Sequence, residues 1–332
     1  MNGSSMVMRF VRVSLCLALS SVCSMAVATA QGKDGVQGSK SGLPPRKLAE
    51  GVLTIVPPNP QPEETALGPM DLDLVKAHPE LAWTAPTFPE NSPFYSSSAE
   101  TLLEKSKGVV LRHPVFALEF AFKPMRMISV EVNGESKLVW YLLYRIRYLG
   151  NDVHPTVIEG EDGIGVPEEP KRKVSESVLF LPRFTLMATQ SQRMLPEQVI
   201  PAAKDAIAAR ERVGKPLLDS VEIMRKIPKS ADGIEHEFWG IATWMNVDPS
   251  TDFFAVHVEG LTNAYRIVEG PNGKKFEKKV LQVHFWRPGD SIDPTLDVIR
   301  LGVPAFEDQE RVQYALKQFG LEQRLDYKWI YR

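Results

Sequence analysis

The chain has 332 residues, of which 43% are hydrophobic and 24% charged, and its formal net charge at pH 7 is −2. These values are ordinary for a globular protein and allow a substantial core in one large or two smaller domains. The slightly negative charge argues against nucleic acid as a partner, because binding phosphates needs a concentrated positive surface.

The first thirty residues have the pattern of a cleaved signal peptide. Arg9 and Arg12 form a positive start, Val13–Val27 is an apolar run, and Ala28–Ala30 has the small-x-small pattern of a cleavage site. The run is shorter than a membrane span, which needs about 20 apolar residues, and it is rich in serine. We therefore expect a mature chain that starts at Gln31, is exported to the periplasm or cell surface, and has no transmembrane span.

Two alternatives to a cleaved signal peptide are a lipoprotein anchored through Cys23 and an uncleaved N-terminal anchor. The lipoprotein has weaker support, because bulky Val22 stands where a lipobox has a small residue. Cleavage after Ala30 would remove the only two cysteines, Cys16 and Cys23, and change the net charge to −4. The mature chain would then contain no disulfide, thiolate metal ligand or cysteine nucleophile.

Two segments are expected to precede the core. Residues 31–69 are rich in Gly, Ser, Lys and Pro and are expected to form a flexible spacer, although Leu53–Val56 could add a short strand. Residues 70–108 are expected to form a short helical lead-in. Its better helix would begin at Ser97, which has capping-box spacing to Glu100, and end at Gly108.

The strongest strand signal is Lys137–Gly150, rich in aromatic and aliphatic residues. Its first half is apolar at both odd and even positions, which predicts a central strand buried on both faces. Its second half alternates, which predicts that Arg145 and Arg147 face solvent. The turn Asn133–Gly134 should join it to the strand before it, and Asn151–Lys173 should be a polar loop.

The rest of the chain adds further strands and two amphipathic helices. Strong helix formers predict a helix over Ile200–Arg212, and a second helix is expected within residues 305–332, ahead of an aromatic docking strand. Between and around them, further strands are expected at Ser177–Met187, Phe238–Val247, Phe253–Val268 and Phe276–Arg287. Many closely spaced strands with few helices predict a mainly β fold, an antiparallel immunoglobulin-like β-sandwich over residues 109–304 with two or three peripheral helices.

Several blocks of sequence occur together in this core. They are VFALEFAFKPMRMI from Val115, VWYLLYR from Val139, WGIATWMNV from Trp239, EGLTNAYR from Glu259 and FWRPGD from Phe285. In these blocks the chain resembles an uncharacterised family of exported proteins from planctomycete bacteria. The resemblance covers residues 109–304 and the last four residues; it implies an exported bacterial protein and carries over no catalytic residues.

One candidate metal site comes from the expected hairpin around Asn272–Gly273. Alternation places His257, Glu259 and His284 on the face that points away from the core. Two imidazoles and a carboxylate on adjacent strands could bind a metal ion such as zinc or act as an acid–base pair. The alternative is an ordinary polar sheet face.

A candidate binding groove combines aromatic and cationic residues, namely Trp244, Trp286, Arg126, Arg145 and Arg147. Indole rings and guanidinium groups recognise sugars or peptides by stacking and by paired hydrogen bonds. The alternative is that the tryptophans belong to the core and the arginines to its rim.

No P-loop, nucleophile elbow or HExxH motif occurs in the sequence. We therefore expect no cofactor, and a non-enzymatic cell-envelope protein that binds a protein or polysaccharide partner. A metal-dependent hydrolase that uses the His257, Glu259 and His284 cluster is one alternative. A purely structural envelope component is another.

Overall fold

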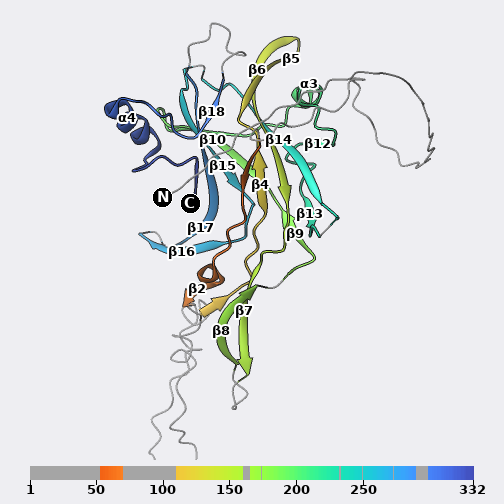
Figure 1. Ribbon diagram of the computed structural model, residues 1–332, viewed down its shortest axis with the longest axis vertical. Helices are drawn as coiled ribbons and strands as arrows, with labels where there is room; N and C mark the ends of the chain where they lie inside the picture. The colour runs from red at the N-terminus through yellow and green to blue at the C-terminus, as the bar shows by residue number, and fades with distance from the viewer. Residues whose placement is uncertain are drawn as a thin grey trace, which may run out of the picture. The chain divides into compact units, whose positions relative to one another are not determined.

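The computed structural model describes residues 53–69, 110–159, 165–172, 174–231, 233–248, 250–271, 273–288 and 298–332 (Figure 1). All of them belong to the unit Ser39–Arg332. The expected signal peptide and the helical lead-in over residues 70–108 lie outside the described residues.

The first of two main sheets is built around the strand that the sequence marks as central. Its order is β1-β4-β6-β14-β12, with β5 also paired to β6, and every pair is antiparallel except β12 with β14. The strands are β1 (Thr54–Val56), β4 (Glu119–Phe122), β5 (Arg126–Val132), β6 (Glu135–Arg147), β12 (Leu217–Leu218) and β14 (Glu237–Met245).

The second main sheet is organised on one long strand, β17. Its order is β11-β10-β15-β17-β16, and β18 and β19 also pair with β17, all antiparallel. The strands are β10 (Arg183–Ala188), β11 (Arg193–Pro196), β15 (Phe253–Glu259), β16 (Tyr265–Gly270), β17 (Gly273–Trp286), β18 (Arg300–Leu301) and β19 (Tyr327–Tyr331).

The remaining elements within the described ranges are three two-stranded sheets and three helices. The strand pairs are β2 (Ala66–Pro69) with β3 (Val110–Arg112), β7 (Val153–Glu159) with β8 (Gly165–Arg172), and β9 (Ser177–Phe180) with β13 (Arg225–Pro228). The helices are the 3-10 turn η1 (Pro62–Thr65), α3 (Pro201–Glu211) and α4 (Gln309–Phe319). The pairing of β7 with β8 corrects the expectation of a loop over Asn151–Lys173, where proline and polar residues hide the strand signal.

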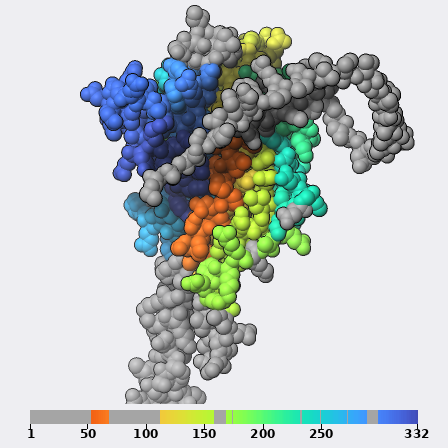
Figure 2. Space-filling model, viewed as in Figure 1, coloured from red at the N-terminus to blue at the C-terminus, as the bar shows by residue number. Residues whose placement is uncertain are grey.

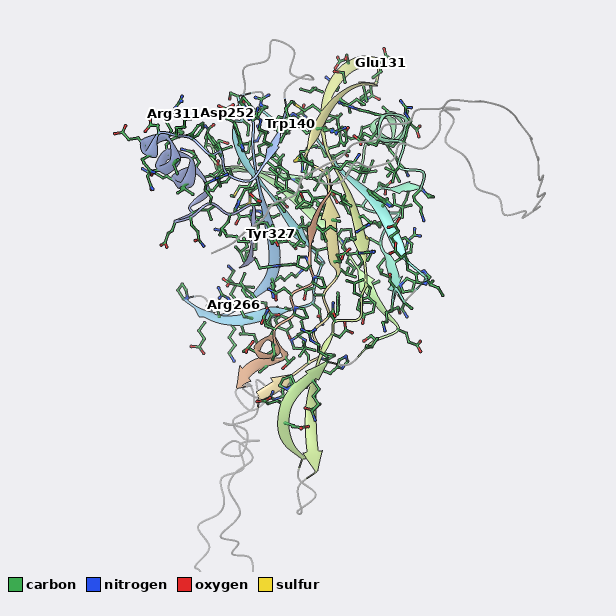
Figure 3. All side chains as sticks on the ribbon, in the orientation of Figure 1. Glu131, Trp140, Asp252, Arg266, Arg311 and Tyr327 are labelled. Carbon is green, nitrogen blue, oxygen red and sulfur yellow. The ribbon has the colours of Figure 1, made fainter. Side chains whose placement is uncertain are left out.

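The main core lies between the two sheets. Even-numbered side chains of β6, from Trp140 to Ile146, meet side chains of β10, β15 and β17 there. The ring of Trp140, labelled in Figure 3, meets the ring of Phe254 edge-on at 5.2 Å. Successive strand residues point to opposite faces, so the even positions form this core while the odd positions point the other way.

Helices α3 and α4 each cover the outer face of one main sheet. Odd-numbered residues of β6, such as Val139 and Leu143, pack with Ala203 and Ile207 of α3. On the second sheet, Phe253 packs with Leu316 and Phe319 of α4 in a separate cluster. The cluster under α3 also contains Tyr141 and Ile241, and the cluster under α4 also contains Val303 and Ala315. The layers are therefore helix, sheet, sheet, helix. A mainly β architecture of antiparallel sheets is confirmed.

The end of the expected spacer is part of this structure, which corrects the expectation of flexibility for residues 53–69. β1 pairs with β4, so the alternative of a short added strand is right. Glu64 then ties the segment to the second sheet: Lys279 Nζ lies 2.5 Å from its carboxylate, and Tyr331 Oη donates to it at 2.6 Å. The C-terminal aromatic strand β19, which includes Tyr327 (Figure 3), pairs with β17 as expected.

The expected strand over Phe253–Val268 is interrupted at Gly260. This residue has φ +92°, and a Cβ on it would lie 2.2 Å from the carbonyl oxygen of Leu181. Only glycine fits such a close approach. Beyond the break β15 pairs again with β17, and Phe253 faces Trp286. Alternation along β15 and β17 keeps the core residues on one face and His257 and His284 on the other, as the sequence predicts.

Candidate functional site

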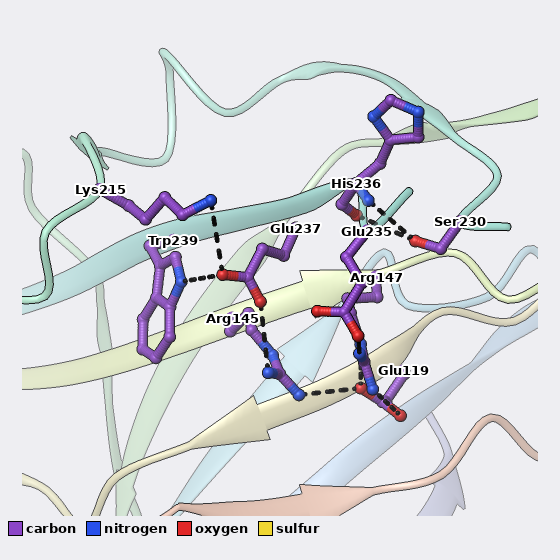
Figure 4. Close-up of polar contacts among 9 residues, drawn as sticks. All are labelled: Glu119, Arg145, Arg147, Lys215, Ser230, Glu235, His236, Glu237 and Trp239. Carbon is purple, nitrogen blue, oxygen red and sulfur yellow. Dashed lines mark hydrogen bonds and ion pairs between the residues drawn. The ribbon is translucent and has the colours of Figure 1, made fainter. Parts of the chain in front are cut away.

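Arg145 and Arg147 do not face solvent but belong to a network of carboxylates on the outer face of the first sheet (Figure 4). Their central partner is Glu119 of β4, which is buried. Arg147 donates to both of its carboxylate oxygens, at 2.8 and 3.1 Å, and Arg145 donates to one at 3.1 Å. This corrects the prediction that both arginines face water.

The same network extends to β14. Arg145 donates to Glu237 at 3.3 Å, and Glu237 accepts a second hydrogen bond from the indole nitrogen of Trp239 at 3.2 Å. Arg147 also donates to exposed Glu235 at 3.2 Å. Each guanidinium thus has carboxylate partners from both flanking segments, and the geometry stabilises the sheet rather than presenting two cations to a ligand.

Arg126 belongs to a different cluster, under the C-terminal end of α3. Fully buried Glu211 accepts from Lys123 Nζ at 2.7 Å, from Tyr141 Oη at 2.7 Å and from Arg126 at 3.0 Å. Burial opposes the charge of Glu211, but the hydrogen bonds from Lys123 and Tyr141 and the charge of Arg126 outweigh it and lower the pKa of its carboxyl. The cluster joins α3 to β5 and β6.

The two tryptophans of the expected groove lie in different layers. Trp244 is fully buried in the main core, where its indole nitrogen donates to the carbonyl oxygen of Leu195 at 3.1 Å. Trp286 packs on the outer face of the second sheet, with the guanidinium of Arg300 5.0 Å above its ring. The five groove residues are therefore not brought together, and the groove prediction is wrong.

His257 and His284 do share one face of the second sheet, as expected, but both are buried. Arg332 Nη1 donates to His257 Nδ1 at 2.7 Å, and His284 Nδ1 donates to the carbonyl oxygen of Leu325 at 2.8 Å. These partners assign the ring protons to Nε2 of His257 and Nδ1 of His284. Neither Nε2 atom has a hydrogen-bond partner among the described residues.

Burial is the main cause that lowers the pKa of both imidazoles to about 4. The positive charges of Arg332 and Lys328 act in the same direction on His257. In the described part of the chain, no three histidine, cysteine or acidic side chains converge as metal ligands, and Glu259 does not complete a site with the two histidines. The pair is neutral at physiological pH and lies in a cationic environment.

No motif or alternation in the sequence marks Glu197, which lies in the segment between β11 and α3. Burial raises the pKa of its carboxyl to about 7, the charge of Asp219 acts in the same direction, and a hydrogen bond with Ser220 opposes them. Glu197 lines a cavity of about 10 Å³ together with Lys204 and Thr243. That space holds about one water molecule, so the carboxyl can exchange a proton with water there, but an organic substrate does not fit.

An exposed apolar surface lies on the pair β9–β13, which Figure 2 shows in green to cyan at the right of the view. Val178 and Phe180 of β9 point into the main core, whereas Leu179 and Leu181 point outward and are 49% and 53% exposed. Phe180 of β9 pairs with Arg225 of β13. Extending this register by one residue places Leu181 opposite Met224, which is 47% exposed.

Val221 lies in the turn before β13, where its carbonyl oxygen accepts from the backbone N–H of Met224 at 3.3 Å, and its side chain is 64% exposed. We call Leu179, Leu181, Val221 and Met224 the β9–β13 surface. Clustered exposed apolar side chains of this kind mark interaction sites.

Searches with this chain found no matching family model, no matching curated protein and no matching solved structure. Within the described ranges, no helix combines the length and the apolar character that a membrane crossing requires.

Proposed function

We propose that the chain is an exported cell-envelope protein that binds a protein partner through the β9–β13 surface. The observation that carries this proposal is the group of four half-exposed aliphatic side chains on β9 and in the segments that adjoin β9 and β13, namely Leu179, Leu181, Val221 and Met224. Covering them would remove apolar area from water, which is the main driving force of association. In this proposal the protein acts by binding and not by catalysis.

The export part of the proposal rests on the sequence pattern of residues 1–30. Membership of the planctomycete family and the immunoglobulin-like topology belong to the same proposal. Expression of the whole chain in a Gram-negative host, followed by fractionation and N-terminal sequencing, tests it. A periplasmic product that starts at Gln31 supports export, and a full-length cytoplasmic product contradicts it. A Cys23→Ser variant tests the lipid-anchored alternative, which predicts that the wild type, but not the variant, fractionates with membranes.

The binding part is tested by site-specific photo-cross-linking in cells that produce the protein naturally. A cross-linking residue at Leu181 is expected to give a discrete adduct with a partner protein. The matched control places the same residue at Tyr314 of α4, which is 54% exposed and lies outside the β9–β13 surface. Equal adducts at the two positions, or none at Leu181, would contradict the proposal.

A second candidate, a structural envelope component, uses the same surface with another copy of the chain as partner. The apolar character of the surface favours it as much as it favours a different protein. In the same experiment, an adduct of twice the chain's mass would identify this case.

A further inference from the structure

The C-terminal strand β19 is flanked by two hydrogen bonds to buried histidines of the second sheet. Just past its end, Arg332 Nη1 donates to His257 Nδ1 at 2.7 Å. Just before its start, His284 Nδ1 donates to the carbonyl oxygen of Leu325 at 2.8 Å. His257 and His284 are 3% and 0% exposed, so the charge of either imidazole bears directly on how β19 is held.

The bond between Arg332 and His257 requires a neutral imidazole. A guanidinium stays protonated and has no acceptor, so Nδ1 of His257 must accept with its lone pair. A proton on Nδ1 would occupy that lone pair and place two cations at hydrogen-bond distance. Nε2 of His257 has no hydrogen-bond partner in the described part of the chain that could stabilise the imidazolium. Protonation therefore replaces an attraction with a repulsion.

Three neighbouring strands place only uncharged or cationic side chains beside His257. Thr185 of β10 lies opposite it on one side and Gln282 of β17 on the other, and Lys328 of β19 follows opposite Gln282. These side chains share the outer face of the sheet, because residues that lie directly opposite one another point to the same side.

The charges that act on His257 all oppose its protonation. They are those of Arg332, His284 and Lys328, and no carboxylate of a described residue is among them. Neither Arg332 nor Lys328 forms an ion pair with a residue that the structure describes. A proton on His257 would thus enter a buried position that already holds two uncompensated cations.

His284 is the weaker of the two sensors. Lys328 opposes its protonation, but Asp326 favours it. Its other neighbours are uncharged: Ala255 of β15 lies opposite it, and the ring of Phe319 of α4 lies 5.0 Å from its own. Its Nδ1 donates to a carbonyl oxygen in both protonation states, so this bond survives in acid.

We propose that His257 and His284 form a pH-sensitive latch, which holds β19 on the sheet at neutral pH and releases it in acid before the two sheets separate. Release lets each imidazole accept a proton in water, away from the two cations. If the pKa of His257 returns from about 4 to 6.5 on release, this residue alone raises the ratio of released to held strand about twentyfold between pH 7 and pH 5. The latch is a regulatory property that does not depend on the β9–β13 surface.

The test follows the tryptophans of the protein labelled with 5-fluorotryptophan by fluorine NMR. Trp329 lies in β19, whereas Trp140 and Trp244 are buried in the main core; a Trp329→Phe variant assigns the first resonance. On acidification from pH 7 to pH 4.5, the resonance of Trp329 is expected to move to the position of exposed fluorotryptophan while the two core resonances stay. A change in all three together, or none at Trp329, would overturn the inference.

Variants identify the groups that take up the protons. In His257→Gln the amide oxygen can accept from Arg332 and does not titrate, so the midpoint for Trp329 is expected to fall by at least about one pH unit. Lys328→Gln should also lower the midpoint, because it removes a cation that acts on both imidazoles. It is the second variant should His257→Gln not fold, and a midpoint that Lys328→Gln leaves in place would contradict the latch.

His236→Gln is the control. His236 lies beside the first sheet (Figure 4), and its imidazole forms no hydrogen bond or ion pair with a described residue. Its midpoint should equal that of wild type. A midpoint that is the same in His257→Gln and in this control would assign the release to Glu64, which bonds to Tyr331 from the other face of β19, and would overturn the inference.

Discussion

Tyr144 of β6 and Gly240 of β14 are direct cross-strand partners, and the phenol ring occupies the space that a side chain on the glycine would fill. A Cβ built on Gly240 would lie 2.4 Å from Cζ of Tyr144 and 2.5 Å from its hydroxyl oxygen. Both residues belong to the centre of the first sheet. The contact therefore allows the largest aromatic cluster of the core to reach the backbone of the neighbouring strand.

Gly240→Ala is expected to destabilise the protein by about 3 kcal/mol, because the ring of Tyr144 is packed on all sides and cannot move away. Denaturant unfolding of the mature chain measures the change. The double variant Gly240→Ala/Tyr144→Leu should recover part of the loss, since the smaller side chain leaves room for the new methyl group. A Gly240→Ala variant as stable as wild type would show that the close contact is not maintained in solution.

Tyr144→Phe tests the hydroxyl separately. This hydroxyl is buried and has no hydrogen-bond partner among the described residues. Removing an unpaired buried polar group is expected to leave the free energy of unfolding unchanged or to raise it by up to about 1 kcal/mol. A loss of more than that would indicate a hydrogen bond to an ordered water molecule.

Glu211→Gln is expected to destabilise the protein by about 3 kcal/mol, because buried Lys123 would keep its charge and lose its carboxylate partner. The double variant Lys123→Met/Glu211→Leu should be much more stable than Glu211→Gln alone, since neither buried charge remains. Arg126 is partly exposed and can then be hydrated. Thermal unfolding of the two variants beside wild type gives the comparison, and equal stability of both variants would contradict the argument.

Glu197→Gln is expected to stabilise the protein above pH 7 and to change little below pH 4.5. The folded-state pKa of this carboxyl is raised to about 7 from an ordinary value of 4.5, so its ionisation opposes folding as the pH rises between these values. The amide removes that cost, on the order of 1–2 kcal/mol after allowance for solvent screening. Melting temperatures at pH 4.5, 6 and 8 test this; a difference that does not grow with pH would assign the effect to packing.

Alternation along the chain predicted which side chains enter the core but not what covers the opposite face. In β6 the pattern placed Trp140 and Tyr144 on one face correctly, because the period of a strand does not depend on its register. The same pattern placed Arg145 and Arg147 in water. Their partners come from β4 and β14, distant in sequence, and no local signal identifies a distant carboxylate.

The candidate sites were less predictable than the core for a related reason. The apolar residues at 178–181 predict a strand, but alternation cannot show that Leu179 and Leu181 stay uncovered while Val178 and Phe180 are buried. Glu197 is an ordinary glutamate in sequence, and only the packing of distant segments raises the pKa of its carboxyl.

The buried imidazoles of His257 and His284 are expected to make the protein less stable in mild acid. The folded-state pKa of each is lowered to about 4 from 6.5, so the unfolded chain binds protons more readily than the folded chain between these values. The contribution of the two neutral imidazoles to the free energy of unfolding is complete above pH 6.5 and is lost as the pH falls towards 4. The loss is on the order of 3 kcal/mol for each group, and the two are coupled, so their effects should not add fully.

Unfolding of wild type and of His284→Gln between pH 7 and pH 4 measures this loss. The variant should be less stable than wild type at pH 7, because the imidazole is well packed against Phe319, but its stability should fall less steeply with acid. Parallel slopes for wild type and His284→Gln would mean that His284 is already protonated, or already exposed, at neutral pH.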